Sequence, residues 1–330
     1  MIKENQHLHS DIFADEPSVE YTRNGYGRGL VEVGRENEDV VAVCADLAGS
    51  TRTHFFKQEF PDRYIEVGVA EQNLATVGSG LAKYGKIPFI SSYAAFNPGR
   101  NNEQIRTTIA LNDVPVKILG AHAGVSVGPD GATHQQLEDI ALMRAQPNMK
   151  VIVPADFQEA KKTVHVAYKQ DGPVYFRVAR EKTPEITTED SPFEFGVANT
   201  LWESDSPDVA IIGCGWLVHK ALVAAKQLKK HEDIDTLVIN NHTIKPMDEQ
   251  AVIQAGKRAG AVVTVEEHQV SAGMGSAVAE ILAQNVPTPQ EFIGVHDQFG
   301  ESGPPMELVE KYGMGVDAII EAVKRVKNRK

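Results

Sequence analysis

Glu71 is the residue of this sequence that most invites a chemical interpretation. It follows Tyr64–Val69, a short β-branched run that favours a buried strand, and it precedes a stretch rich in Ala and Gly that favours a helix. A carboxylate at the end of a buried strand costs free energy unless something binds it. It is therefore either a structural carboxylate stabilised by the positive end of the helix dipole or a carboxylate used in chemistry.

A second group of titratable residues lies in a glycine-dense stretch, residues 120–135, and consists of His122, Asp130 and His134. Glycine lets the backbone approach a ligand closely, and such loops often carry function. The spacing of these three residues matches no common metal-binding motif. We therefore expect contacts to a substrate or cofactor, with a structural hydrogen bond as the alternative for His134.

Arg23, Ser50 and Arg180 could together form an anion site, although each alone would be an ordinary surface residue. A guanidinium directs two N–H donors at one phosphate, so two arginines, a hydroxyl and a histidine suit a dianion. Arg177 is the alternative to Arg180. Tyr93 and Phe96 are either core aromatics or a surface on which a flat ring stacks.

The elements that must position these residues alternate between strand and helix. This alternation is typical of an α/β fold, in which a mainly parallel sheet is covered by helices on both faces. Ligands bind at the carboxyl ends of such strands, and Glu71, Tyr93, His122 and Arg180 should fall just past strand ends. Strands are predicted at 40–44, 64–69, 87–91, 116–120, 150–153 and 174–178, and helices from 21 and at 72–84, 101–111, 137–145 and 157–169.

The length of 330 residues predicts two domains. Residues 1–17 are polar and patternless and predict a loose tail or docking arm. A loop rich in Thr, Glu, Asp and Pro, residues 181–192, marks the domain boundary. A second, smaller α/β domain follows, with a hairpin at 193–202, strands at 209–213, 235–239, 261–266 and 291–295, and helices at 218–230, 248–258 and 275–284.

The composition argues against several classes of protein. A net charge of −12 disfavours a nucleic-acid or anionic-membrane surface. No apolar run could span a bilayer and the N-terminus lacks an apolar signal core, so we expect a cytoplasmic protein. The two cysteines, Cys44 and Cys214, each follow an apolar strand and predict buried thiols rather than a redox or metal site.

Taken in order, these segments resemble transketolase from about Tyr21 to the C-terminus. The resemblance rests on Tyr64–Asn73, Phe89–Phe96, Gly120–Gly124 and Gly128–Gln135. It implies two doubly wound domains: a thiamine-diphosphate pyrimidine-binding domain at 21–185 and a transketolase C-terminal domain at 186–330, after an N-terminal tail at 1–20. Glu266-Glu267-His268 and the turn at Gly273–Ser276 lie in the second domain and are interpreted as structural or as an interface.

The resemblance also implies roles for the site residues. Glu71 would hydrogen-bond a pyrimidine nitrogen of the cofactor and drive formation of the imino tautomer that takes the thiazolium proton. His134 would lie near the cofactor and the reacting carbons. Phe96 is the favoured stacking residue, and the usual transketolase stacking position aligns with Ile90. Other cofactor contacts would be Tyr93, Phe89 and Asp46, and substrate contacts would be Arg23, Ser50, His122 and Arg180 at the phosphate and Asp130 at a hydroxyl.

The Gly-Asp-Gly motif that binds magnesium in this family does not occur. The resemblance therefore implies a separate N-terminal partner subunit that supplies the Mg²⁺ ligands and binds the diphosphate, with two copies of each chain in the complex. Carboxylate and carbonyl oxygens suit that hard cation. The expected reaction is transfer of a two-carbon ketol unit from a ketose phosphate to an aldose phosphate.

Two alternatives remain open. The first is a β subunit of a 2-oxoacid dehydrogenase, or a relative of deoxyxylulose-phosphate synthase. The dehydrogenase substrate carries no phosphate, which would leave Arg23 and Arg180 unexplained, and the synthase has arginine where His122 stands. The second is a non-catalytic scaffold that has kept the fold. Retention of all five of the residues Glu71, His122, Asp130, His134 and Arg180 argues against it.

Overall fold

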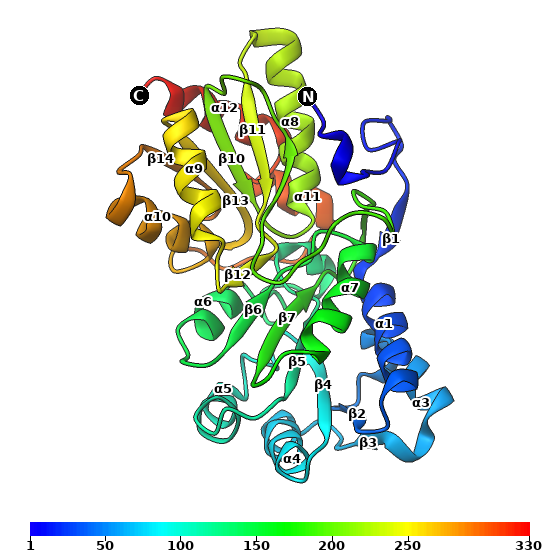
Figure 1. The fold of residues 1–330 in the computed structure, drawn as a ribbon. Coiled ribbons are helices and arrows are strands. Elements are labelled where there is room, and N and C mark those ends of the chain that lie inside the picture. The colour runs from blue at the N-terminus through cyan, green and yellow to red at the C-terminus, as the bar shows by residue number, and fades with distance from the viewer.

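The computed structural model describes residues Met1–Lys330, which form two stacked α/β units around two mainly parallel sheets (Figure 1). The first sheet has seven strands in the order β12-β6-β7-β5-β4-β2-β3, and only β12 runs antiparallel to its neighbour. Its strands are β2 (Val40–Cys44), β3 (Tyr64–Glu66), β4 (Ile87–Tyr93), β5 (Lys117–Ala121), β6 (Lys150–Ile152), β7 (Val174–Val178) and β12 (Thr243–Lys245).

Helices cover both faces of this sheet because its strands are apolar on both sides. They are α1 (Thr22–Glu36), α2 (Ala48–Thr51), α3 (His54–Glu59), α4 (Glu71–Lys83), α5 (Asn102–Gln104), α6 (Asp139–Arg144) and α7 (Phe157–Tyr168). Helices α1 and α7 approach closely: a Cβ at Gly25 would lie 2.2 Å from the Phe157 carbonyl oxygen. Only glycine fits there, which fixes the start of α1 against α7.

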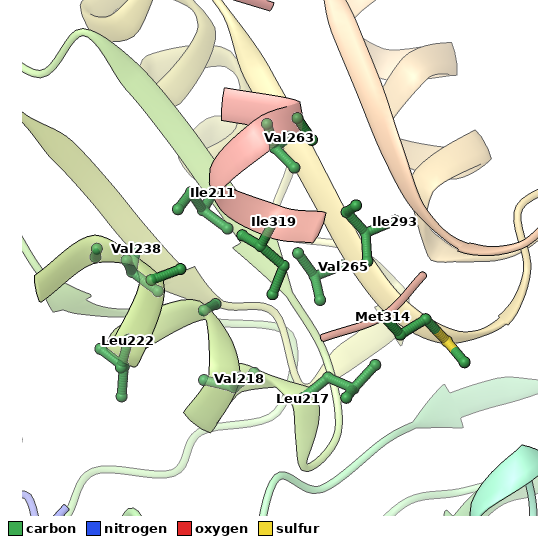
Figure 2. Close-up of a cluster of buried hydrophobic side chains, with 14 of the residues drawn as sticks. Ile211, Leu217, Val218, Leu222, Val238, Val263, Val265, Ile293, Met314 and Ile319 are labelled. Atoms are coloured by element: carbon green, nitrogen blue, oxygen red, sulfur yellow. The ribbon is translucent and has the colours of Figure 1, made fainter. Parts of the chain in front are cut away.

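The second sheet has five strands in the order β14-β13-β10-β11-β9, of which only β9 is antiparallel to its neighbour. Its core is formed by Ile211, Val263 and Val265 of the strands packed against Leu222 and Ile319 of the helices (Figure 2). The strands are β9 (Asn199–Trp202), β10 (Val209–Gly213), β11 (Thr236–Asn240), β13 (Val262–Gln269) and β14 (Gln290–Val295). The helices are α8 (Leu217–Glu232), α9 (Glu249–Ala259), α10 (Met274–Asn285), α11 (Pro305–Lys311) and α12 (Val316–Lys327).

The N-terminal segment is not the loose tail that its composition predicts. It contains a short 3-10 turn, Glu4–Gln6, and lies beside α8 (Figure 1). Ile12 is 1% exposed in the core of the second unit, and its carbonyl is 2.8 Å from His219 Nε2. Backbone bonds from Lys3 to Leu201 and from His9 to Ile186 hold the rest. Polar composition did not reveal these contacts because the backbone makes most of them.

Several element predictions also need correction. The hairpin at 193–202 is a single strand, β9. The strand predicted at 64–69 ends at Glu66, and the helix at 101–111 is one short α turn followed by a π-helical segment, Ile105–Ala110. An antiparallel pair, β1 (Val19–Tyr21) with β8 (Lys182–Pro184), was not predicted. Neither were β12, the short helices α2 and α3, and the final helices α11 and α12.

The two units share buried cores rather than meeting at a solvent-filled boundary. The cluster around the second sheet includes Val125, Leu137 and Ala155 of the first unit. Strand β12, which follows β11 in the chain, joins the edge of the first sheet beside β6, at the junction of the units (Figure 1). No helix in the structure combines the length and apolarity that crossing a bilayer requires.

Candidate active site

Glu71 is the first residue of α4 and is 2% exposed. Its Oε2 accepts a 2.6 Å hydrogen bond from Arg100 Nη1, and its backbone carbonyl accepts a bond from the Asn101 amide at 2.8 Å. Arg100 also lies over the Phe96 ring, with its guanidinium carbon 4.4 Å from the ring centroid. The buried Glu71 carboxylate therefore faces a flat cation, the Arg100 guanidinium, which is stacked on the Phe96 ring. The rest of this open groove is lined by Val69, Ala70, Gln72, Asn73, Thr76 and Gln104.

Tyr93, at the end of β4, and Phe96, in the following turn, form an aromatic wall next to Glu71. Their rings are nearly parallel, with centroids 6.1 Å apart. His122 packs on Tyr93 at 4.3 Å, and His134 meets the Phe96 ring edge-on at 5.3 Å. Residues predicted from three separate segments thus gather at the carboxyl ends of the neighbouring parallel strands β4 and β5.

His122 lies in a basic cluster. Arg23 Nη1 is 3.1 Å from His122 Nε2 and must be the donor, so the histidine carries its proton on Nδ1. Burial, with added repulsion from Arg23, Arg180 and Arg52, lowers the pKa of His122 to about 3. Burial and the neighbouring Arg52 likewise lower the pKa of Arg23. His122 is therefore neutral at physiological pH, and its buried Nδ1 and the buried Nε of Arg23 have no protein partner.

Arg180 and Asp130 lie together at the rim of this cluster. Arg180 Nη1 is 2.9 Å from Asp130 Oδ1 and donates to the Val127 carbonyl at 2.6 Å. Arg177, the alternative to Arg180, is 6% exposed and lies 3.3 Å from Asp139 in the interior. It points away from the cluster, so Arg180 alone of the two is available to a ligand.

Phe89 corrects one prediction. It is fully buried in the core with Tyr26 and Leu30, under α1. A side chain without any exposed surface cannot touch a ligand in the groove, so Phe89 is a structural residue. Ile90, on the opposite face of β4, is fully buried as well. Among the aromatic candidates only Tyr93 and Phe96 border the site.

Asp46 and Ser50 lie on the loop that follows β2. The Asp46 side chain is exposed, and its backbone N–H donates to Glu66 Oε1 at 2.7 Å. The Ser50 carbonyl accepts from Arg23 at 3.3 Å. Asp46 (φ 57°) and His122 (φ 57°) both adopt the left-handed backbone region, which costs a non-glycine residue roughly 1–2 kcal/mol. Such outliers concentrate at functional sites.

The sequence did not identify Arg52, Arg100 and Glu66 as site residues. Arg52 is anchored by Asn24 and the Gly49 carbonyl beside Arg23. Glu66 binds the N–H groups of Asp46 and Gly68 and so fixes the loop that leads to Glu71. Arg52 follows the predicted Ser50 by two residues, which is the only local signal. Nothing near Arg100 in the sequence reveals that it meets Glu71, 29 positions away.

The fold and this site together define a transketolase-type α/β chain. Residues 21–185 match the family described as "Transketolase, pyrimidine binding domain", and residues 186–319 match "Transketolase, C-terminal domain". The chain belongs to the transketolase family and corresponds to the C-terminal section of its enzymes.

Individual relatives agree with this assignment. A "Putative transketolase C-terminal section" of Methanocaldococcus jannaschii is 42% identical over 91% of this chain and 94% of its own length. The "6-deoxy-6-sulfo-D-fructose transketolase subunit" of a Clostridium strain is 38% identical over 94% and 95%. A solved structure described as "Split gene transketolase, inactive beta4 tetramer" superposes with a TM-score of 0.87 at 44% identity, over 93% of this chain and 98% of that one.

Proposed function

We propose that this chain is the pyrimidine-binding subunit of a split transketolase that moves a two-carbon ketol unit between sugar phosphates. The observation that carries the proposal is the buried Glu71 carboxylate, which borders a groove that Arg100 also lines, with the Arg100 guanidinium over the Phe96 ring. The basic cluster of Arg23, His122 and Arg180 lies beside Tyr93, the other ring of the aromatic wall. One end of the site thus suits a cofactor ring and the other a sugar phosphate.

The groove fits the pyrimidine end of thiamine diphosphate. Arg100 in the free chain demonstrates the geometry that is needed, since a flat group stacks on Phe96 and donates N–H to Glu71. An aminopyrimidine ring can make the same two contacts. When bound, thiamine diphosphate supplies the nucleophilic carbon and stores the electrons of the transferred unit. In this proposal Glu71 holds the proton at the ring nitrogen, and Phe96 and Tyr93 orient the ring.

The substrate would meet the cluster from the opposite side. Arg23 and Arg180 supply guanidinium N–H donors to this cluster. Neutral His122 adds an Nδ1–H that has no protein partner. Such donors suit a phosphate dianion, and they also suit the sulfonate of a 6-deoxy-6-sulfo sugar, which the clostridial relative is named for. We propose that Asp130 accepts from a substrate hydroxyl after it separates from Arg180, and that His134, edge-on to Phe96, lies beside the reacting carbons.

A partner subunit completes the site in this proposal. No Gly-Asp-Gly motif occurs in the sequence, so we assign the Mg²⁺ ligands and the diphosphate contacts to a second chain. The expected unit holds two copies of each chain in the cytoplasm. The domain boundary at residues 185/186 and the roles of the site residues are part of the same proposal.

The test is a ketol-transfer assay on the chain purified with its partner, thiamine diphosphate and Mg²⁺. We expect transfer from a ketose phosphate, or a sulfonated ketose, to an aldose phosphate. Release of CO₂ from a 2-oxoacid would instead support the dehydrogenase alternative, and lack of any turnover in a complex that binds the cofactor would support a scaffold.

A further inference from the structure

The loop that carries His122, Asp130 and His134 packs against the second domain. We call residues 122–136 the histidine loop. Its Val125 and the adjoining Leu137 belong to the same buried cluster as Trp216, Leu308 and Val309. The loop therefore has its core contacts in the C-terminal domain, although it starts at the end of β5 and leads into α6 of the first unit.

Glu267, on β13, makes the central polar contact. Its Oε1 accepts the backbone N–H of Ser126 at 2.7 Å, and its Oε2 accepts the Trp216 indole N–H at 2.7 Å. The carboxylate is thus held between one donor from the histidine loop and one from its own domain. Arg177 donates to the Glu267 carbonyl at 3.2 Å, and burial, opposed mainly by Arg177, raises the pKa of the Glu267 carboxyl.

Close contacts at two glycines show that the histidine loop packs directly against the C-terminal domain. A Cβ at Gly124 would lie 2.2 Å from the Glu267 carboxyl carbon, and Gly124 also has a φ of 92°. A Cβ at Gly300 would lie 1.9 Å from Gln135 Oε1. The Glu267 and Gln135 side chains thus lie directly against the backbone at Gly124 and Gly300, so the loop is seated on the domain.

Gln135 makes the second polar contact. Its amide nitrogen is within hydrogen-bond distance of three carbonyls: Val125 at 3.1 Å, Gly128 at 3.3 Å and Glu301 at 2.9 Å. Two of these lie in the histidine loop, and the third lies in the C-terminal domain, on the segment before α11. The loop is therefore held from both its early and its late half.

From these contacts we propose that the C-terminal domain acts in the reaction by positioning the histidine loop, with Glu267 as the positioning residue. This rests on the proposed function, because it assigns to Glu267 the orientation of the substrate contacts at His122 and Asp130. Glu267 touches no substrate itself. It fixes the loop backbone at Ser126, which lies midway along the chain between these two contacts.

The matched pair Glu267→Gln and Glu266→Gln isolates this role. Both residues are buried neighbours on β13, and both changes replace a carboxylate by an amide. Glu266 binds the N–H groups of Met274 and Gly275 at the start of α10, inside its own domain. Each amide faces two N–H donors with only one acceptor oxygen, but only Glu267→Gln sets that conflict against the histidine loop, where it must present N–H to either Ser126 or Trp216.

We expect Glu267→Gln, in complex with the partner, to raise KM for the phosphorylated donor about 10-fold or more, since it weakens a charge-assisted bond. kcat should fall less, and thermal unfolding should resemble that of Glu266→Gln. Amide hydrogen exchange at residues 122–136 should speed up in Glu267→Gln alone. Equal KM values and equal exchange in the two variants would overturn the proposal.

A rescue experiment separates positioning from general damage. Trp216→Phe removes one of the two donors, so the amide that Glu267→Gln introduces can accept from Ser126 without a conflict in the double variant. We expect Glu267→Gln to raise KM less when it is added to Trp216→Phe than when it is added to the unaltered chain. Additive losses would contradict a specific role. The hydrogen-exchange result stands even if the complex shows no ketol transfer, so a failure of the proposed function would remain distinguishable.

Discussion

Glu71 is a buried carboxylate whose only side-chain partner in the free chain is Arg100, an arginine that is 47% exposed. Glu71→Gln should abolish ketol transfer and leave fold and partner binding unchanged, because an amide cannot exchange a proton with the ring nitrogen. The loss should be of order thousands-fold in rate, which corresponds to several kcal/mol of transition-state stabilisation.

A steady-state assay of the complex checks this, with Glu103→Gln on α5 as the exposed control. If Glu71→Gln retained more than about a tenth of the activity, Glu71 would have no role in activating the cofactor.

Arg100 occupies the position that the proposed pyrimidine ring needs, so it must leave when the cofactor binds. Arg100→Ala should therefore tighten cofactor binding by the complex, by up to about fivefold, because a half-exposed ion pair contributes about 1 kcal/mol or less. Calorimetric titration with thiamine diphosphate measures this, and Arg106→Ala, at an exposed arginine further along the same segment, is the control. Weaker binding in Arg100→Ala would identify Arg100 as a cofactor ligand instead.

Arg180→Ala should chiefly raise KM for phosphorylated substrates. A charged hydrogen bond to phosphate acts equally in the ground and transition states, so its loss costs about 1.5–3 kcal/mol of binding with little change in kcat. Kinetics with a phosphorylated and an unphosphorylated donor provide the comparison. Arg180→Ala leaves the Asp130 carboxylate without its partner, so the Asp130→Asn variant is measured alongside to separate the effect of that unpaired charge. Equal losses with both donors would show that Arg180 does not bind the phosphate.

At the scale of elements, a buried acid pair joins α7 to the second domain. Asp156 caps α7 and accepts the N–H groups of Ile186 and Thr187, while Glu159 accepts from Ala155 and from Asn240 on β11. Burial, and then Asp156, raises the pKa of Glu159 to about 8 from an ordinary value of 4.5. The folded chain thus keeps a proton that the unfolded chain releases above pH 4.5.

Because the folded state binds more protons in that window, this carboxyl makes the folded chain less stable as pH rises from about 4.5 to 8. Glu159→Gln should flatten the pH dependence of unfolding between about pH 5 and 8 relative to the unaltered chain. Chemical denaturation across that pH range measures the difference. Parallel curves for the two proteins would show that Glu159 is ionised throughout.

Element prediction succeeded where periodicity is strong and failed where contacts are tertiary. Strands β2, β7 and β10 agree with the predicted ranges because each is a continuous apolar run. The pair β1 and β8 was missed, since its two short strands lie far apart in the chain and neither has an apolar pattern. Phe89 was misassigned because strand alternation alone does not reveal which face of β4 lies under α1.

At the scale of the whole molecule, the isolated chain should neither bind thiamine diphosphate tightly nor turn over substrate. It offers one carboxylate and an aromatic wall to the pyrimidine end of the cofactor. These contacts are a small fraction of those that hold the cofactor in a complete site. Calorimetry of the purified chain with cofactor and Mg²⁺ decides, and micromolar binding or turnover without a partner would contradict the split arrangement.

The sequence by itself determined the α/β class, the transketolase family and most of the residues that gather at the site. This was possible because strand ends place chemistry-bearing residues at one sheet edge, and because the motifs lie in short contiguous segments. Glu71, Phe96, His122 and His134 could be named from such segments alone.

Only the tertiary structure decided which groups face one another. Arg100 meets Glu71, Arg180 meets Asp130, and Glu267 meets Ser126 from 141 positions away. The docking of the N-terminal segment and the addition of β12 to the first sheet belong with these contacts. Each depends on backbone groups or single side chains brought together by tertiary packing, within the first domain for Glu71 and Asp130 and between the domains for Glu267 and β12. Such pairings leave no periodic trace along the chain.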